Sequence, residues 1–264
     1  MDFRRIESIF LIVFIGLNIF LGISYFQNHQ VSLATTRSGN SEIMADIRRD
    51  QIKVPKLSKK APTGGYLSSQ RNVALRSSQQ ALTNQTITYS GSKILTLHSQ
   101  LVTPETVKRA DRVRFLKNWV KTSSNVRFGD QYEYAPGLSS GNHIVFAQNS
   151  GKLVYDRRAQ LVFSFSDSRL IGYTQTYIET LRVLRSNVSL CSEQDAIITL
   201  YRDNELTNNA KVVWTKLAYS YLLDAKGSTV YVPMWLVGVQ PAGSKTVTIK
   251  HLNAITKTVV KTAE

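Results

Sequence analysis

Residues 211–252, KVVWTKLAYSYLLDAKGSTVYVPMWLVGVQPAGSKTVTIKHL, decide the fold class. Three runs, 211–224, 228–240 and 245–252, are rich in the β-branched and aromatic residues typical of strands. Lys226-Gly227 and Ala242-Gly243 separate them and are typical of tight turns. The stretch therefore predicts a three-stranded antiparallel meander.

The chain upstream of this meander continues the β pattern. We expect strands at residues 142–148, 160–166 and 170–182, with turns at 149–151 and 166–168. Ser192 and Asp195 have the spacing of a helix capping box, which predicts a helix through residue 203. Strands with one helix make residues 136–264 a second α+β domain.

Residues 36–135 predict a first α+β domain, with the boundary marked by Pro136. Thr103-Pro104-Glu105 is typical of a helix start and predicts a basic helix over residues 104–122. The other expected elements are a short helix at 41–51, a loop or weak edge strand at 54–65, and strands at 66–75, 86–89 and 93–101.

The N-terminal segment is of a different kind. Residues 9–26, IFLIVFIGLNIFLGISYF, carry no charge, and a helix of this length spans about 27 Å, close to the hydrocarbon thickness of a bilayer. Arg4 and Arg5 precede the run, so a cytoplasmic N-terminus at 1–8, an anchor at 9–27 and an extracytoplasmic body are expected. A cleaved signal peptide is the alternative, although its apolar core is normally shorter.

One side of the predicted anchor suits a helix–helix contact. Ile15, Asn18, Gly22 and Tyr25 are spaced three and four apart, so they share a face. An amide at mid-membrane is costly unless it is bonded, and glycine permits close approach of two backbones. These residues are candidate partner-binding residues, and a single tolerated Asn is the alternative.

Charge and cysteine content narrow the class of protein. The formal net charge of the 264 residues is +15, and the charges before the apolar run cancel, so the excess lies beyond it. A basic surface attracts nucleic acid, anionic lipid or wall polymer, and a position outside the cell excludes nucleic acid. The one cysteine, Cys191, cannot form an internal disulfide and is typical of a small buried side chain.

Catalytic and metal-binding motifs are not convincing. Residues 137–141, GLSSG, match the form of a hydrolase elbow, but Ala-Pro precedes the motif and a strand-like run follows it, where a strand and then a helix are required. The four histidines are scattered and lack metal-ligand spacing. We therefore predict no catalytic, cofactor-binding or metal-binding residue, and no enzyme activity.

An aromatic row lies within residues 173–177. Tyr173, Gln175 and Tyr177 share one face of a strand. Two interpretations stay open, a row packed in the core or a groove that binds a partner segment.

Several stretches together resemble the YycI (WalI) family, the membrane-anchored accessory proteins of the WalK/WalR (YycG/YycF) two-component system in Gram-positive bacteria. The resemblance rests on the opening residues 1–21, on Phe146-Ala-Gln148 with Gly151, on the GYTQTY block at 172–177, on the helix at 196–201, and on Pro233-Met-Trp235.

The resemblance implies a single-pass membrane protein that regulates cell-wall signalling. Its implied partners are a WalK-like sensor histidine kinase and a homologous YycH-like protein, with no cofactor. Two alternatives from other classes are an anchored module that binds anionic wall polymer through residues 108–127 and a wall hydrolase.

Overall fold

The computed structural model describes residues 11, 13–21, 39–78 and 81–261. The chain divides into two compact units, residues 1–51 and residues 52–264. In the first unit, residues 11, 13–21 and 39–49 are helical. The helix over residues 39–49 confirms the one predicted at 41–51. No helix of the described residues is both long and apolar enough to cross a membrane. The predicted cytoplasmic segment 1–8 and much of the anchor 9–27 lie outside the described residues.

The second unit is α+β, with two antiparallel sheets of six described strands each, which confirms the predicted class. Sheet A has the order β12 (Val259–Val260), β11 (Thr248–Asn253), β10 (Ser228–Gln240), β1 (Thr63–Gln70) and β8 (Arg182–Ser189), with β9 (Lys211–Ala225) also paired to β10. Sheet B has the order β2 (Gln85–Ser90), β3 (Thr96–Thr106), β7 (Arg169–Gln175), β6 (Gln160–Ser166), β5 (His143–Gln148) and β4 (Tyr132–Tyr134).

The central strand of sheet A is β10. It pairs with β9 over its full length, while its other edge is shared by β1 at residues 228–231 and β11 at residues 234–239. Lys226 and Gly227 both have positive φ, 46° and 79°, as the predicted tight turn between β9 and β10 requires. The helix α4 (Glu193–Arg202) carries the predicted capping box between Ser192 and Asp195.

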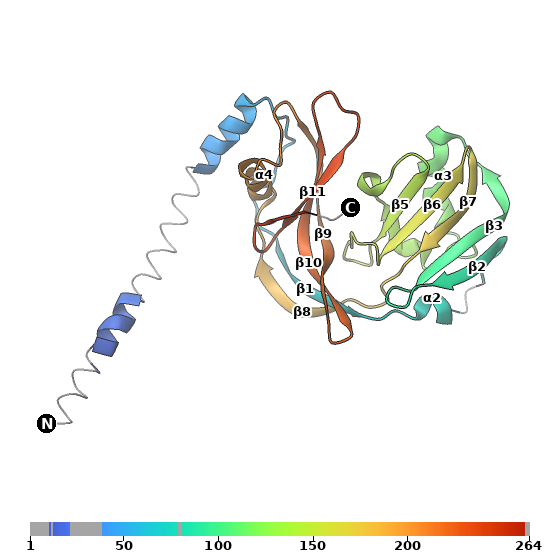
Figure 1. The fold of residues 1–264 in the computed structure, drawn as a ribbon, viewed down its shortest axis with the longest axis horizontal. Coiled ribbons are helices and arrows are strands. Elements are labelled where there is room, and N and C mark those ends of the chain that lie inside the picture. Colours follow the sequence, from blue (N-terminus) through green and yellow to red (C-terminus); the bar gives the residue numbers. More distant parts are fainter. Residues whose placement is uncertain (1–10, 12, 22–38, 79–80, 262–264) are drawn as a thin grey trace. The chain divides into compact units, whose positions relative to one another are not determined.

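Sheet B is inserted between two strands of sheet A in the sequence. Its strands run from residue 85 to residue 175, whereas β1 and β8 lie before and after them, and Figure 1 shows sheet B in green and yellow as a layer of its own. The predicted boundary at Pro136 does not coincide with this division, because β4 and β5 on either side of it pair with each other. A short connection at 135–142 joins those two strands.

The predicted basic helix over 104–122 is much shorter in the structure. β3 continues through Thr106, and only α3 (Arg112–Trp119), preceded by a 3₁₀ turn at Arg109–Asp111, is helical. Glu105 pairs with Leu170 of β7, and Pro104 lies within the register shift between Gln100 and Glu105. A bulge tolerates proline because no ladder hydrogen bond is needed there, so strand pairing overrides the local helix-start pattern.

The predicted strands at 66–75 and 170–182 are also corrected. β1 ends at Gln70 and a short helix, α2 (Ala74–Ser77), follows it, while β7 ends at Gln175. Residues 63–65, expected to belong to a loop or weak edge strand, open β1.

One hydrophobic core lies under sheet B and α3. Trp119 of α3 packs its ring edge against Phe163 at a centroid distance of 5.7 Å and against Tyr173 at 6.0 Å. A second cluster joins the sheets, with Ala147 of β5 among Ala218, Val232 and Leu236 of sheet A. The second unit therefore holds its two sheets against each other through buried apolar side chains.

Candidate interaction surface

Two of the four predicted membrane-face residues lie in the described chain. Ile15 is 49% exposed, and the Asn18 Nδ2 donates to the Phe14 carbonyl at 2.8 Å, one helical turn away. Gly22 and Tyr25 lie outside the described residues. A contact face formed by these four residues therefore stays a prediction.

The row Tyr173, Gln175 and Tyr177 is buried, with exposed fractions of 2%, 0% and 7%. Tyr173 Oη donates to the Asn125 carbonyl at 2.8 Å, and Gln175 Nε2 donates to the Arg127 carbonyl at 2.6 Å. Burial raises the pKa of Tyr173, so its phenol stays protonated and remains a donor. The structure favours the core interpretation over a groove, because these side chains offer almost no surface to a partner.

The GLSSG motif has a structural role. Ser139 Oγ donates to the Ala135 carbonyl and accepts from the Val145 amide, both at 2.9 Å. A 3₁₀ turn at Pro136–Leu138 precedes the serine and β5 follows it, so the strand–serine–helix order of a nucleophile elbow is not present. Ser139 thus joins the start of β5 to the preceding turn.

A metal centre and a reactive thiol are two further candidates for chemistry. The part of the chain that the structure describes has no cluster of three or more His, Cys, Asp or Glu able to hold a metal ion. Cys191 is buried, and burial raises its pKa to about 11. A thiol with a pKa this high carries little thiolate, the form that attacks substrates.

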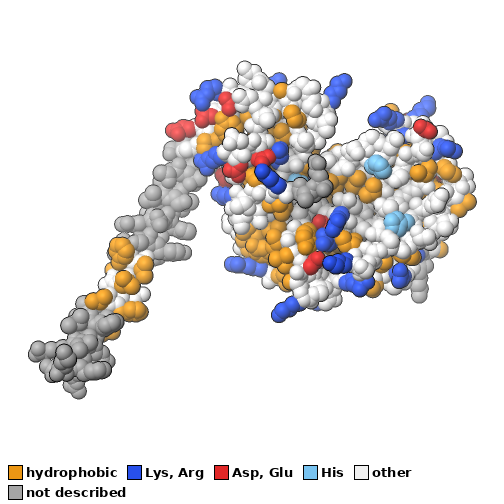
Figure 2. Space-filling model, in the orientation of Figure 1, with side chains coloured by type: hydrophobic (Ala, Val, Ile, Leu, Met, Phe, Trp, Pro, Cys, Tyr) orange, Lys and Arg blue, Asp and Glu red, His pale blue; other side chains and the backbone are white. Residues whose placement is uncertain are grey.

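Two of the basic side chains in the segment 108–127 are directed inward. The Arg112 side chain is 3% exposed, lies over the Phe165 ring at 4.2 Å, and donates to Asn142 Oδ1 at 3.1 Å. Arg127 donates to Tyr89 Oη at 2.7 Å. Lys and Arg side chains are spread over the face of the second unit drawn in Figure 2 rather than gathered in one patch. The basic segment therefore contributes less exposed charge than its sequence indicates.

The strand β8 forms an exposed edge of sheet A. Among the described strands it pairs only with β1, and seven of its eight residues are exposed. Val183 and Leu184 are 60% and 58% exposed. Successive residues of a strand point to opposite faces, so both faces of β8 present an apolar side chain to solvent.

The pairing of β8 with β1 is irregular, and Gly65 permits it. Two register shifts interrupt the ladder between Gly64 and Leu67. A Cβ at Gly65 would lie 1.7 Å from the Arg185 carbonyl oxygen, so only glycine allows this approach. Asn187, also on β8, has a φ of 57°, in the left-handed region.

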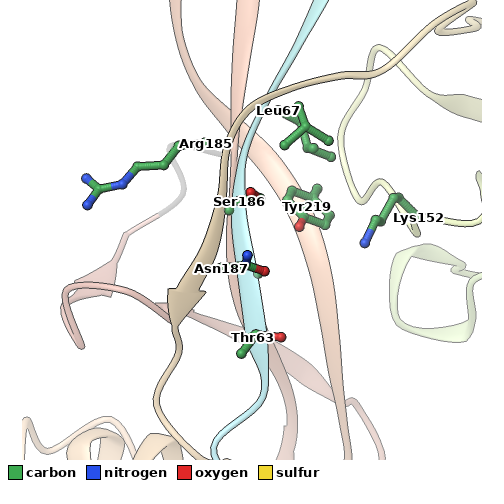
Figure 3. Close-up of a pocket in the computed structure, with 10 residues that line it drawn as sticks. Thr63, Leu67, Lys152, Arg185, Ser186, Asn187 and Tyr219 are labelled. Carbon is green, nitrogen blue, oxygen red and sulfur yellow. The ribbon is translucent and has the colours of Figure 1, made fainter.

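A cavity of about 150 Å³ lies beside this strand. Figure 3 shows Lys152 reaching towards Tyr219 from the opposite side, while Arg185 points away. Lys152 Nζ lies 6.0 Å from the centre of the Tyr219 ring. This edge was not predicted from the sequence, although Val183 and Leu184 between Arg182 and Arg185, followed by Val188, were a usable strand signal.

We call the exposed strand with Val183 and Leu184 the β8 edge. An unpaired strand edge presents backbone donors and acceptors that a second chain can use, and Val183 and Leu184 add one exposed apolar side chain on each face of the strand. The β8 edge is thus suited to protein contact rather than to catalysis.

Comparison with known proteins gives a family and distant structural likenesses. The YycI protein family matches residues 30–255. No curated protein matches the chain.

Two solved structures resemble the fold distantly. An uncharacterized protein from Eubacterium rectale is 6% identical with a TM-score of 0.42, over 81% of this chain and 92% of that one. The Bacillus megaterium YpeB C-terminal domain is 14% identical with a TM-score of 0.39, over 68% of this chain and 89% of that one.

The family match spans all of sheet B, all strands of sheet A except β12, and most of the chain. It agrees with the resemblance carried by Phe146-Ala-Gln148, by the block at 172–177 and by Pro233-Met-Trp235. The chain therefore belongs to the YycI family, whose members are regulatory accessory proteins of the WalK/WalR two-component system and are not known as enzymes.

Proposed function

We propose that this chain is a membrane-anchored, non-enzymatic regulator of a WalK-type sensor histidine kinase that acts together with a YycH-like partner. The observation that carries the proposal is the family match over residues 30–255. The anchor is the apolar run within residues 9–27, with residues 1–8 cytoplasmic and the two sheets extracytoplasmic. The expected location is the cell membrane.

The mechanism we propose is differential binding. A regulator shifts a kinase between two states only if it binds one state more tightly than the other. A tenfold shift requires about 1.4 kcal/mol of difference in binding free energy. Contacts of the anchor face, with Ile15 and Asn18, and of the β8 edge, with Val183 and Leu184, are able to supply an amount of this size.

The two alternative functions have less support. Binding of anionic wall polymer through residues 108–127 has to proceed without Arg112, which is buried against Phe165. A wall hydrolase built on the GLSSG motif would need a free Ser139 hydroxyl, which is instead bonded to Ala135 and Val145.

Co-purification with the kinase from detergent-solubilised cells tests the proposal. The intact chain is compared with a chain whose residues 6–27 are replaced by an unrelated anchor, with an Asn18→Leu, Gly22→Leu double variant, and with a Val183→Lys, Leu184→Lys double variant. We expect the intact chain to retain the kinase and the anchor variants to lose it.

The variants separate the two surfaces. Retention of the kinase by both anchor variants, but not by the β8 variant, would transfer recognition to the outer unit. Absence of the kinase from the intact-chain sample would contradict the proposed function.

A further inference from the structure

A small apolar cavity lies where sheet B meets sheet A. Its volume is about 170 Å³, and its walls are mainly aromatic rings and small or aliphatic side chains. Its lining includes Ala147 of β5, Leu153 of the following loop, Tyr155, and Trp214 of β9. This cavity is distinct from the one beside β8, which is lined by other residues.

The cavity is held open by the packing of Trp214. A Cβ at Gly137 would lie 2.5 Å from Trp214 Cζ2, and a Cβ at Gly238 would lie 2.4 Å from Trp214 Cε2. The indole ring is therefore clamped between two glycines. Ala147 is fully buried and carries only a methyl group. A fixed ring on one side and a small side chain on the other keep the walls apart.

An ion pair marks the mouth of the cavity. Lys216 Nζ lies 3.1 Å from Glu133 Oε1, and the two side chains are 44% and 41% exposed, so the mouth reaches solvent. Asn149 Nδ2 donates to Glu133 Oε2 at 3.1 Å and holds the carboxylate in place. The rim is thus charged with both signs, while the interior is apolar.

The size of the cavity limits what enters it. An apolar protein cavity of about 150 Å³ accepts a molecule such as benzene, whereas sites for drug-sized ligands occupy about 300–1,000 Å³. An acyl chain or a sugar is too large or too polar. One aromatic ring or one branched aliphatic side chain fits both the volume and the lining.

The charged rim favours a protein as the source of that group. A side chain that enters the cavity brings the polar backbone and the neighbouring residues of its own chain to the mouth. Glu133 and Lys216 offer an acceptor and a donor side by side, which suits a segment that has both a basic and an acidic or carbonyl group beside its apolar residue. A buried apolar anchor with a polar rim is the usual arrangement of an interface hot spot.

We propose that this cavity receives one phenylalanine- or leucine-sized side chain from a protein partner, whose flanking polar groups meet Glu133 and Lys216. The inference rests on the proposed function in one respect, namely that the partner is a protein of the signalling complex. It adds the place and the chemistry of the contact, which the family match does not give.

The test uses the full chain and measures its affinity for the YycH-like protein and for the kinase, each purified in detergent. Ala147→Leu and Leu153→Phe fill the cavity from two sides. Leu153 is only partly buried, so we expect its variant to fold even if the fully buried Ala147 site resists enlargement. Val162→Phe, an equally large apolar change at a partly buried residue of β6 outside the cavity, is the matched control.

We expect a filled cavity to weaken binding of one partner at least about 10-fold, as loss of a hot-spot anchor does, while Val162→Phe binds within about twofold of the unmodified chain. Equal binding by the unmodified chain and both filled variants would overturn the inference and leave the proposed function intact. Failure of the unmodified chain to bind either partner would overturn the proposed function, and the inference with it.

Discussion

The buried amide of Gln148 gives the most direct test of what holds the second unit together. Gln148 is 2% exposed at the end of β5. Its Nε2 donates to the Ile178 carbonyl at 2.7 Å, and its Oε1 accepts from the Ile178 amide at 2.8 Å. One side chain therefore satisfies both backbone groups of a buried residue in the segment that leads from sheet B to β8.

Replacement of Gln148 by leucine keeps the approximate volume and removes both hydrogen bonds. Each buried backbone group left without a partner costs about 1–3 kcal/mol, so the expected loss of unfolding free energy is about 2–6 kcal/mol. A loss of this size is a large fraction of the 5–15 kcal/mol that typically stabilises a domain.

Urea unfolding of the full chain in detergent, followed by tryptophan fluorescence, measures this loss. Gln100→Leu is the matched control, because Gln100 is an exposed glutamine of β3. We expect the control to change stability by less than about 0.5 kcal/mol. If Gln148→Leu destabilises the chain no more than Gln100→Leu does, the reasoning from backbone satisfaction is refuted.

Gly238→Ala places a methyl group 2.4 Å from Trp214 Cε2; we expect a loss of about 1–3 kcal/mol from overpacking and a shift in Trp214 emission, and an unchanged spectrum and unfolding midpoint would contradict the clamp. Burial raises the pKa of Cys191 to about 11, so a thiol reagent at pH 8 should label the unfolded chain but not the folded one, and equal labelling rates would show the thiol to be accessible. Burial lowers the pKa of His251 below its ordinary value of 6.5, so below about pH 6.5 the unfolded chain binds one more proton than the folded chain and stability decreases as the pH is lowered. His251→Gln should reduce this loss of stability at low pH, and an identical pH profile of unfolding would count against the prediction.

Where local chemistry and strand pairing agree, the sequence predicts the structure well. The strand 228–240 has the predicted bounds, because Lys226-Gly227 supplies the positive φ values of its turn. The helix after Ser192 begins as predicted, because its capping box satisfies the first backbone amides locally. Both signals depend only on residues close together in the chain.

The errors arise where distant residues decide. Thr103-Pro104-Glu105 has the chemistry of a helix start, yet Glu105 pairs with Leu170 and its carboxylate accepts from Trp119 Nε1 at 3.0 Å. The insertion of sheet B between β1 and β8 is also a long-range property, since Thr63 pairs with Ser189. Such pairings have no signature within a window of ten or fifteen residues.

Three of the residues that carry the family resemblance, Gln148, Gln175 and Trp235, have structural roles. The Gln148 side chain hydrogen-bonds both the amide and the carbonyl of Ile178. Gln175 Nε2 donates to the Arg127 carbonyl, and Trp235 Nε1 donates to the Cys191 carbonyl at 3.0 Å. These are buried polar contacts that fix the fold, so they identify the family without locating the surface that acts. The candidate surfaces, the β8 edge and the cavity beside Trp214, depend on exposure and packing, which the sequence alone does not give.

Kinase activity in a reconstituted membrane tests the central claim most directly. The WalK-type kinase is placed in lipid vesicles, alone or with an excess of this chain and the YycH-like protein, and its autophosphorylation rate is measured. The account predicts that the intact chain changes this rate, and that a chain with residues 6–27 replaced by an unrelated anchor changes it much less. An autophosphorylation rate unaffected by the intact chain, under conditions where the chain is inserted and folded, would contradict the account.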